Sequence, residues 1–459
     1  MANQRKLLFV IGLAQSCYYG ERDFMTGKRI VFCTFGSLGD LYPLLALARE
    51  MKHRGHTPVV ATSPAYRTLI EAEEIAFHPV RPDVDVSDPS VLRRVMDRRN
   101  GGRYLFCDII LPALRDSYAD TARVAAGSDL LVIHPIVVAA LLFARKSGLP
   151  WASVAVAPMS LCSAYDPPVF SGLPFAEKLA SFGPGTQKLF LKLIAAMFEP
   201  VWKQFREFEK ELGLSRSPNP LLWGHSPHLA LGLFSPVLAA PQPDWPADAH
   251  ATGFPFLGHD HGNTTELQEF LDSGEPPIVF TLGSAAVGVA GDFYEQSAEA
   301  ARRLGRRAVL LVGRDPENQP KHPLPPGVMA VQYAPHSAVF PRACVVVHQG
   351  GIGTTGESMR AAHPTLVVHY GHDQPDNAMR LVRLGMARGI PRERYNTDTA
   401  VREIRFLLEN KTYAESAACV GQQVRKENGT ARACDLLDRL LQAPRREAPS
   451  LQLTGQGVA

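Results

Sequence analysis

Short apolar segments rich in β-branched residues alternate along this chain with segments of helical periodicity, and the whole rhythm occurs twice. Apolar runs of about four to eight residues are typical of strands buried on both faces, as in a parallel sheet covered by helices. The segment 41–55, by contrast, repeats apolar residues every three or four positions and stops at Gly55, which predicts a helix. In the first half, the strands are expected at residues 30–35, 57–62, 129–134, 151–157 and 229–234.

A proline-rich segment at 235–258 interrupts this rhythm, which then restarts with strands expected at 276–283, 307–313, 328–334, 344–350 and 365–371. With 459 residues, the chain is long enough for two hydrophobic cores. We therefore expect an α/β protein with two Rossmann-like, doubly wound domains that face a central cleft. The predicted divisions are an extension (1–27), a first domain (28–235), a linker (236–262), a second domain (263–442) and an unstructured tail (443–459).

The charge and cysteine content of the chain indicate which partners and which compartment to expect. The 48 Lys and Arg nearly balance the 45 Asp and Glu, and no basic run is interleaved with aromatic residues, so nucleic acid is not expected as a partner. The seven cysteines are scattered without a C-x-x-C pair, which indicates reduced thiols and a cytoplasmic protein. Arg5, Lys6 and the apolar stretch 7–14 resemble a short signal peptide, but the free cysteines favour an extension or a misplaced start.

A glycine-rich turn between an apolar strand and a helix is the most informative motif. In HQGGIGTTGE the glycines let backbone N–H groups approach a ligand, the threonines add hydroxyls, and the helix presents its positive end. The spacing fits neither a nucleoside triphosphatase loop nor a dinucleotide G-x-G-x-x-G motif. A diphosphate suits this loop, and a tight turn with a threonine cap is the alternative. The expected ligands are His348, Gln349, Gly350, Gly351, Gly353, Thr354 and Thr355.

Further polar residues follow neighbouring strands at the same predicted edge of the sheet. Asp373 and Gln374 come just after the strand 365–371, and oxygen acceptors of this kind suit the hydroxyls of a sugar. Tyr333 and His336 follow the strand 328–334, where an aromatic ring can stack on a nucleobase. A core tyrosine and a solvated aspartate are the alternatives for each residue taken alone.

These motifs resemble those of glycosyltransferase family 1, whose members have the GT-B fold. The similarity covers roughly Lys28 to Leu441, is densest from Tyr333 to Asn377, and is greatest with bacterial rhamnosyltransferases, sterol glucosyltransferases and antibiotic glycosyltransferases. The resemblance implies a nucleotide-sugar donor, with UDP-glucose as the first expectation, and a small lipophilic or phenolic acceptor. It assigns Tyr333 to the base, the glycine-rich turn to the phosphates, and Asp373 with Gln374 to the hexose. Ser284, in TLGS, resembles a serine of the family near the phosphates.

Three positions depart from the pattern of the family. Gln349 stands where bacterial members often have a second histidine, so His348 and the helix end must stabilise the leaving diphosphate without it. His336 stands where many members have glutamine. Glu357 is one residue further from His348 than the ribose-binding glutamate of plant members, which leaves its role open.

Transfer to a hydroxyl with inversion needs one general base and no covalent nucleophile. Asp40, in FGSLGDLYP, follows the first strand, and His134 follows the strand 129–134. A lone carboxylate with a pKa of about 4 is a weak base, so we expect Asp40 and His134 to form a dyad in which either carries the proton. The alternatives are a helix N-cap for Asp40 and a buried backbone contact for His134.

The acceptor surface is expected in the first domain and includes the loop 160–175. The segment 187–212 carries a broad apolar face at Phe190, Leu191, Ile194, Met197, Phe198, Trp202 and Phe205. Such a face is typical of a core, but it also suits a groove for a lipophilic acceptor or contact with a membrane surface, which Lys188, Lys192, Lys203 and Arg206 would permit. We expect a monomer or a weak dimer.

Two further hypotheses remain open from the sequence. The D-x-D pattern at Asp83 to Asp85 resembles a metal site but lies in a polar loop, so we expect a solvated turn and neither a metal nor another cofactor. A sugar-nucleotide epimerase or hydrolase would share the architecture, as would a catalytically silent protein that binds a sugar nucleotide.

Overall fold

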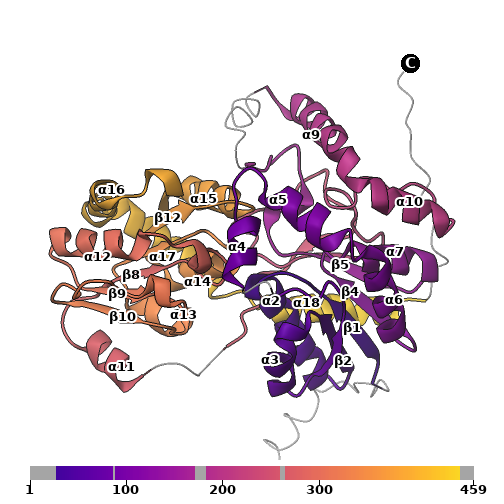
Figure 1. Cartoon of the computed structure of the whole chain (residues 1–459), viewed down its shortest axis with the longest axis horizontal. Helices are drawn as coiled ribbons and strands as arrows, with labels where there is room; N and C mark the ends of the chain where they lie inside the picture. Colours follow the sequence, from indigo (N-terminus) through magenta and orange to yellow (C-terminus); the bar gives the residue numbers. More distant parts are fainter. Residues whose placement is uncertain (1–26, 86–87, 171–181, 259–263, 445–459) are drawn as a thin grey trace, which may run out of the picture.

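The computed structural model describes residues 27–85, 88–170, 182–258 and 264–444. Two parallel β-sheets lie side by side (Figure 1), and the strand order of the first is β3-β2-β1-β4-β5-β6-β7. The order of the second is β10-β9-β8-β11-β12-β13. The strands are β1 (Arg29–Cys33), β2 (Thr57–Thr62), β3 (Ala76–Pro79), β4 (Leu130–Ile133), β5 (Trp151–Ala155), β6 (Ala230–Gly232), β7 (Ala249–Ala251), β8 (Ile278–Thr281), β9 (Ala308–Leu311), β10 (Val328–Val331), β11 (Val345–His348), β12 (Thr365–His369) and β13 (Ala387–Pro391).

Helices connect the strands and cover both faces of each sheet. In β1, Ile30 and Phe32 pack into one hydrophobic cluster, whereas Val31 and Cys33 pack into another on the opposite face. The expected α/β fold of two doubly wound domains is therefore confirmed. The longer helices are α2 (Leu38–His53), α3 (Arg67–Ala72), α4 (Pro89–Val95), α6 (Leu114–Ala125), α7 (Val138–Ser147), α9 (Pro184–Phe198), α10 (Lys203–Glu211), α11 (Thr265–Asp272), α12 (Phe293–Leu304), α14 (Ile352–Ala361), α15 (Gln374–Arg383), α16 (Thr397–Glu409), α17 (Lys411–Val424) and α18 (Gly429–Gln442).

Shorter helical segments complete the connections. The π-helical segment η2 (Tyr104–Ile110) follows the short helix α5 (Gly101–Arg103), and α13 (His336–Val339) follows β10. The 3-10 segments are η1 (Pro64–Tyr66), η3 (Pro158–Leu161), η4 (Glu199–Trp202), η5 (Ala286–Val289), η6 (Pro316–Asn318), η7 (Phe340–Arg342) and η8 (Arg392–Arg394).

All ten strands expected from the sequence are present, mostly shortened by one or two residues at an end, and three further strands were not expected. β3, β7 and β13 are edge or near-edge strands with few consecutive apolar residues, so they lack the signal that marks the central strands. β7 lies within the range predicted as the linker and pairs with β6. Most of the extension and tail, linker residues 259–262 and loop residues 171–175 lie outside the described residues, and the domain boundaries stay predictions.

Two segments cross from one domain to the other. The C-terminal helix α18 returns to the first sheet, where Arg54 of α2 bonds to Asp435 and Asp438 at 2.7 and 2.8 Å (Figure 1). In the opposite direction, α4 extends from the first domain onto the second, and the side chain of its Leu92 packs against Gly288 of η5. The two domains therefore share an extensive packed boundary around the candidate site.

Candidate active site

Both sheets place candidate residues where the strand order changes direction. In the first sheet this point lies between β1 and β4, which are followed by Asp40 and His134. In the second sheet it lies between β8 and β11, which are followed by Ser284 and the glycine-rich turn. Crevices at such switch points are where doubly wound sheets bind their ligands.

Asp40 lies in the first turn of α2 and is held there by the backbone of its own loop. Ser37 is the N-cap residue, so the alternative of Asp40 as the N-cap was wrong: Asp40 is the third residue of a capping box. The Ser37 N–H and hydroxyl donate to Asp40 Oδ2 at 2.8 and 3.1 Å. The second carboxylate oxygen, Oδ1, faces His134 Nε2 at 3.5 Å. Oδ2 is thus held by Ser37, and Oδ1 remains available to accept a proton.

His134 lies behind Asp40 and is almost completely buried. Its Nδ1 accepts a 3.4 Å hydrogen bond from the N–H of Ile136, which places the proton of the neutral ring on Nε2, the atom that faces Asp40. Burial lowers the pKa of His134, although the nearby Asp40 carboxylate opposes that shift. The side chain of Asp40 is 28% exposed and that of His134 9%, so Asp40 is the member of the pair that an incoming hydroxyl can reach.

The N-terminus of α14 has no side-chain cap. Gly351 is its N-cap residue, and the N–H groups of Ile352, Gly353 and Thr354 have no hydrogen-bond partner among the described residues. Gly353 is exposed, and a Cβ there would meet open space. Free N–H groups at the positive end of a helix form an anion site.

His348 ends β11 directly behind this helix end. Its Nδ1 accepts a 2.9 Å hydrogen bond from the N–H of Gly350, so Nε2 carries the proton of the neutral ring. Burial lowers the pKa of His348 to about 3, and His336 adds to the shift. Nε2 is buried and has no hydrogen-bond partner among the described residues. His348 is therefore a neutral donor near the N-terminus of α14 and not a cation.

Gln349 and Thr355 add two more buried polar atoms without partners among the described residues, Oε1 and Oγ1. The amide nitrogen of Gln349 fills the space beside Gly283 and Gly351, where a Cβ would lie only 2.2 and 2.7 Å from it. Gln349 thereby joins the loop after β8 to the glycine-rich turn. Ser284, the next residue of the β8 loop, is exposed.

The first turn of α15 lies against the glycine-rich turn. Gly350 adopts a φ of +89°, and a Cβ there would lie 3.0 Å from the carbonyl oxygen of Gln374. Asn377 donates from Nδ2 to both Gly350 O, at 2.9 Å, and Asp373 Oδ2, at 2.8 Å. Gln374 Oε1 accepts from the N–H of Tyr370 at 2.8 Å. The residues predicted to hold the phosphates and the hexose therefore form one connected structure.

Asp373 connects this structure electrostatically to the first domain. Burial raises the pKa of Asp373 to about 7, and the Asp40 carboxylate raises it further, against the hydrogen bond from Asn377. The neighbouring His372 bonds to the carbonyl oxygen of Val95, in α4, at 2.9 Å and also senses the charge of Asp40. The candidate base and the candidate sugar-binding residue thus face each other across the domain boundary.

The residues predicted at the nucleobase lie around the side chain of Tyr333, which is 51% exposed. The His336 ring stacks on Phe340 with centroids 4.5 Å apart, and burial lowers its pKa to about 4. Glu357 pairs with Arg360 at 2.7 Å. Burial raises the pKa of the Tyr333 phenol, and the nearby Glu357 adds to the shift. The exposed ring of Tyr333 therefore has a free surface on which a base can stack.

Sequence reasoning missed Asn377, His372 and Tyr42. Asn377 is four residues after Asp373 on a helix, and this spacing is a signal that could have identified it. His372 has a φ of +55° in the loop of Asp373. Burial raises the pKa of Tyr42 to about 12, and Tyr333, across the boundary, adds to the shift. Only the fold brings these last two to the site.

Among the described residues, including the acidic loop after β3, no group of three or more His, Cys, Asp or Glu side chains could hold a metal ion. Asp83 and Asp85 are exposed, and the backbone carbonyl of Val84 accepts a hydrogen bond from Ser63 at 3.2 Å. Within the described residues, the loop is irregular and is held at the Val84 carbonyl, and the solvated turn stays a prediction.

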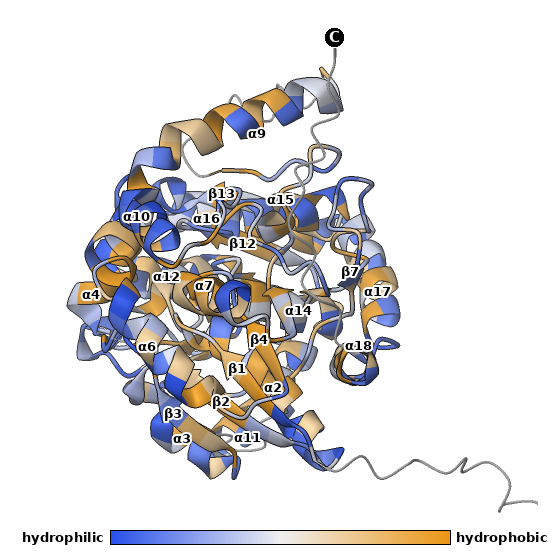
Figure 2. Ribbon diagram, turned by 90° about the vertical axis from the view of Figure 1, so that its right-hand side faces the viewer, coloured by the Kyte–Doolittle hydropathy of each residue, from blue (hydrophilic) through white to orange (hydrophobic). Residues whose placement is uncertain are grey.

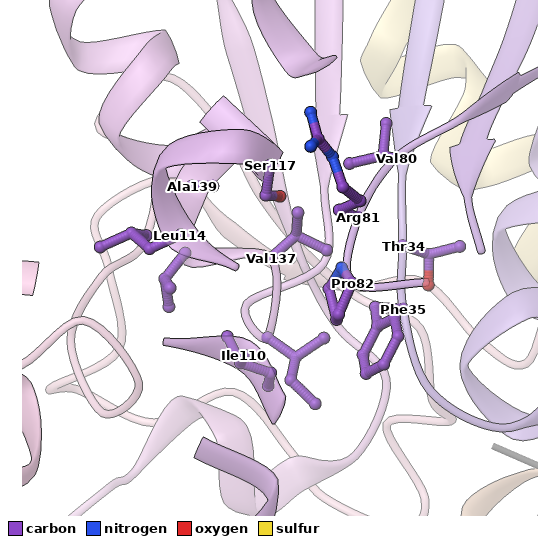
Figure 3. Close-up of a pocket in the computed structure, with 12 residues that line it drawn as sticks. Thr34, Phe35, Val80, Arg81, Pro82, Ile110, Leu114, Ser117, Val137 and Ala139 are labelled. Atoms are coloured by element: carbon purple, nitrogen blue, oxygen red, sulfur yellow. The ribbon is translucent and has the colours of Figure 1, made fainter. Parts of the chain in front are cut away.

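An apolar pocket lies in the first domain near the loops that carry Asp40 and His134, and Figure 3 shows side chains that line it. Thr34, which lines it, donates to the carbonyl oxygen of Asp40 at 3.2 Å, and Ile136 is the residue that bonds to His134. The lining residues come from the ends of β1 and β4, from η2 and α6, and from the segment 80–82. They are Thr34, Phe35, Val80, Arg81, Pro82, Ile110, Leu114, Ser117, Ile136, Val137, Val138 and Ala139.

The apolar segment 187–212 divides into two faces. Leu191, Ile194, Trp202 and Phe205 are buried, as a core face predicts. Met197 and Phe198 are instead exposed, together with Leu189 and Leu193 of the same helix. The single broad face expected from the sequence was therefore wrong. Leu191 and Ile194, three apart, share the buried side of α9, whereas Leu189, Leu193 and Met197, four apart, share the exposed side.

Two families match the chain. Residues 30–117 match the glycosyltransferase family 28 N-terminal domain, and residues 308–434 match the family described as erythromycin biosynthesis protein CIII-like, C-terminal domain. The first match contains β1 and Asp40 but not β4, and the second contains β11 and the glycine-rich turn but not β8.

Individual relatives span most of the chain. An O-mycaminosyltylonolide 6-deoxyallosyltransferase of Streptomyces fradiae is 32% identical over 425 residues, which cover 89% of this chain and 97% of the relative. A sterol 3-beta-glucosyltransferase of Leptosphaeria maculans is 27% identical over 91% of this chain, but the match spans only 29% of that much longer protein.

Solved structures share the fold. The glycotransferase of kitacinnamycin has a TM-score of 0.66 at 23% identity over 90% of this chain and 99% of its own. The glycosyltransferase VinC, solved in complex with dTDP, has a TM-score of 0.60 at 18% identity over the same shares.

Proposed function

The chain belongs to glycosyltransferase family 1 and is a sugar transferase that uses a nucleotide sugar, and from that premise we propose an inverting transfer of a hexose to a hydroxyl of a small lipophilic or phenolic acceptor. UDP-glucose is the donor that we propose first. The name of the Streptomyces relative and the dTDP bound to VinC make a dTDP-linked 6-deoxyhexose the second candidate. An epimerase, a hydrolase and a silent binding protein are no longer needed as alternatives.

The uncapped N-terminus of α14 is the observation that carries the proposal for the donor. Three free N–H groups, the neutral Nε2–H of His348 and the hydroxyl of Thr355 are donors that would hold a diphosphate. Because the diphosphate is also the leaving group, these donors would stabilise the charge that develops during transfer. The proposal needs no metal ion, and we expect EDTA to leave the rate unchanged.

Asp373 and Gln374 are proposed to bind the hexose hydroxyls. They begin the helix that contacts Gly350, which places a sugar next to the phosphates. Tyr333 is proposed to stack on the base, with His336 and Glu357 beside it and Ser284 near the phosphates.

Asp40 is proposed as the general base, with His134 as the residue that orients it. The geometry supports this division of the dyad because Nε2 of His134 already bears a proton that faces the carboxylate. Asp40 would accept the proton of the acceptor hydroxyl as its oxygen attacks the anomeric carbon, and the bond to the diphosphate would break on the opposite face. The anomeric configuration would therefore invert.

The apolar lining of the pocket near the dyad suits a lipophilic group, but the pocket has room for only about one water molecule and must widen before an acceptor can enter. The Thr34 hydroxyl donates to the backbone carbonyl of Asp40, and the backbone N–H of Ile136 donates to His134 Nδ1, so the pocket lies near the base although neither member of the dyad lines it. Its only charged side chain, that of Arg81, is neutralised by Asp120, with Nε 2.8 Å from Oδ2.

A mass-spectrometric screen tests this function. Wild-type protein is incubated with UDP-glucose, UDP-galactose, UDP-N-acetylglucosamine or dTDP-rhamnose and with phenolic, sterol, macrolide or hydroxy-fatty-acid acceptors. We expect a hexosylated product whose anomeric configuration, measured by NMR, is opposite to that of the donor. A product that retains the configuration contradicts the single-base mechanism, and release of free sugar without transfer contradicts the proposed acceptor class.

We also propose that α9 rests on an anionic membrane surface. Leu189, Leu193 and Met197 recur every four residues on the side turned away from the protein, each more than half exposed, and the helix projects from the body (Figure 2). Lys188 and Lys192 flank this stripe, and no acidic residue occurs from 182 to 198. An apolar stripe with basic flanks suits an interface with acidic lipids. Among the described residues, no helix has the length and apolarity to cross a membrane.

Flotation with lipid vesicles tests this contact. We expect wild-type protein to float with vesicles that contain 30 mol% phosphatidylglycerol but not with pure phosphatidylcholine. Leu193→Ser with Met197→Ser should abolish flotation, whereas Phe406→Ser, at an exposed phenylalanine of α16, should not. Light scattering of the free protein should show a monomer or a weak dimer. A wild-type dimer that the α9 variant abolishes would instead assign the stripe to a second copy of the chain.

A further inference from the structure

A buried ionic network joins the first domain to α15. Asp166, in the loop after η3, pairs with Arg380 and, at 3.0 Å, with Arg383. Arg380 Nε also bonds to Asp376 Oδ2 at 2.8 Å. Asp376 Oδ1 in turn accepts a 3.0 Å hydrogen bond from the N–H of Val169. Two points of one loop are thus attached to one face of one helix.

The network is desolvated at its centre. The side chains of Arg380 and Asp376 are 4% and 2% exposed, and that of Asp166 is 18% exposed. Buried charges of this kind require partners with good geometry, because an unpaired charge at such a site is strongly destabilising. The loop therefore cannot leave α15 without exposing or isolating these charges.

The same loop is attached a second time, to the segment between β6 and β7. Ser163 Oγ donates to Asp244 Oδ1 at 2.6 Å, and the N–H of Ala164 donates to Asp244 Oδ2 at 2.8 Å. Residues 163–169 therefore form a strap between Asp244 and α15.

The helix that receives the strap also carries the proposed sugar-binding residues. Asp373 is the N-cap residue of α15, Gln374 and Asp376 lie in its first turn, and Arg380 lies one turn further along the same helix. Asn377, between them, bonds to Gly350 of the diphosphate site. One helix thus contacts the strap and the proposed donor site.

We infer that Asp376 and Arg380 are positioning residues that seat the strap 163–169 against the donor-binding helix, so that the acceptor site is complete only when the two domains are in contact. This inference rests on the proposed function, because the strap belongs to the loop expected to line the acceptor site. Cutting the attachment should weaken acceptor binding and leave donor binding intact, since the first turn of α15 stays in place.

Asp166→Asn tests the inference with little risk to folding. It removes the charge that crosses the domain boundary and keeps the buried pair of Asp376 and Arg380 within α15. Arg98→Ala is the matched control, because Arg98 pairs with Glu393 across the same boundary at 3.2 Å but with both side chains about half exposed. Steady-state kinetics with each substrate varied, and donor titration by calorimetry, supply the readouts.

We expect Asp166→Asn to raise the acceptor KM about tenfold, to change the donor KM and donor Kd less than twofold, and to increase release of free sugar relative to transfer. Asp166→Glu should recover most of the loss, and Arg98→Ala should match the wild type. An unchanged acceptor KM in folded Asp166→Asn overturns the inference. Donor and acceptor KM values that rise together also overturn it, since they indicate a general loosening of the boundary.

Failure of the proposed function gives a different result. In that case the wild type itself binds the donor and modifies no acceptor. Hydrogen exchange then tests the attachment directly: Asp166→Asn should accelerate exchange of the amides in 163–169 but not of those in β12. Equal exchange of the strap in variant and wild type overturns the inference by this route as well.

Discussion

The N-termini of α2, in the first domain, and α14, in the second, follow the same local sequence pattern but are capped in different ways. Each follows a buried parallel strand and a glycine-containing loop. The end of α2 is closed by its own side chains, because Ser37 and Asp40 satisfy one another's backbone N–H groups in a capping box. The end of α14 has Gly351 at the corresponding place, and no side chain caps it.

This difference explains how two similar domains divide one reaction. At α2, the capping box supplies hydrogen-bond acceptors to N–H groups of the first turn and holds the Asp40 carboxylate in place. That carboxylate suits proton acceptance, and its charge disfavours the binding of a second anion. At α14, the glycines leave the N–H groups free for a diphosphate. The first helix end therefore serves the acceptor, and the second serves the donor.

Asp40→Asn removes the carboxylate at the acceptor-side helix end and has the largest expected effect on the rate. Asparagine keeps an oxygen for the Ser37 N–H, so the capping box survives while the basicity is lost. We expect kcat to fall by about 10³-fold, within the range of general-base contributions, with donor affinity unchanged by calorimetry. A kcat within about fivefold of the wild type would remove Asp40 from the mechanism.

His348→Ala breaks the comparison on the donor side. It removes a neutral N–H donor, and we expect a loss of about 10²-fold in kcat. Because burial holds the pKa of His348 at about 3, the pH profile of the wild type should show no inflection from this residue between pH 5 and 8. An inflection near 6.5 that disappears in His348→Ala would show that the residue acts as a cation.

The pH dependence of stability at Asp373 tests how close this residue lies to Asp40 of the first domain. Its folded pKa of about 7 lies above its unfolded value, so its contribution to stability is full below about pH 4 and is lost as the pH rises through 7. Asp373→Asn should therefore gain stability relative to the wild type by about 1 kcal/mol or more between pH 5 and 8, as measured by urea unfolding. Asp40→Asn should lower the midpoint of this change, since the Asp40 charge contributes to the shift. A stability difference that does not vary with pH would contradict the burial of Asp373.

Ser37→Ala has the smallest expected effect and sharpens the comparison. It removes one half of the capping box and should cost about 1 kcal/mol in the free energy of unfolding. With one partner of Oδ2 gone, the acceptor KM should change by no more than a few-fold. Loss of activity as large as in Asp40→Asn would mean that the capping hydroxyl is itself part of the proton transfer.

Local patterns made the donor side predictable from the sequence. The strand, the glycines and the helix start are consecutive, so their order alone indicated that Gly350 and Gly353 would allow an anion to approach. The charge state of His348 was not predictable, because its neutrality depends on burial and on the hydrogen bond from the Gly350 N–H.

The acceptor side was less predictable because its contacts join distant residues. The sequence suggested that Asp40 and His134 would meet, but not that Ser37 occupies one carboxylate oxygen and leaves the other for His134. Asp166 pairs with Arg380, more than 200 positions away in the sequence, and no periodic pattern in the sequence predicts such a contact. β7 was not predicted, because it lies in a proline-rich segment and its three residues do not form an apolar run typical of a strand.

The central claim is that the open end of α14 holds the diphosphate, and calorimetric titration of UDP and dTDP into Gly353→Asp tests it most directly. A Cβ fits at Gly353, and a carboxylate in the first helical turn favours the helix, so this variant should be as stable as the wild type or more so. It would give α14 the closed, anionic end that α2 already has. We predict at least about tenfold weaker nucleotide binding in Gly353→Asp and unchanged binding in the control Gly353→Ala. The claim would be contradicted if Gly353→Asp bound each nucleotide with the same affinity as Gly353→Ala.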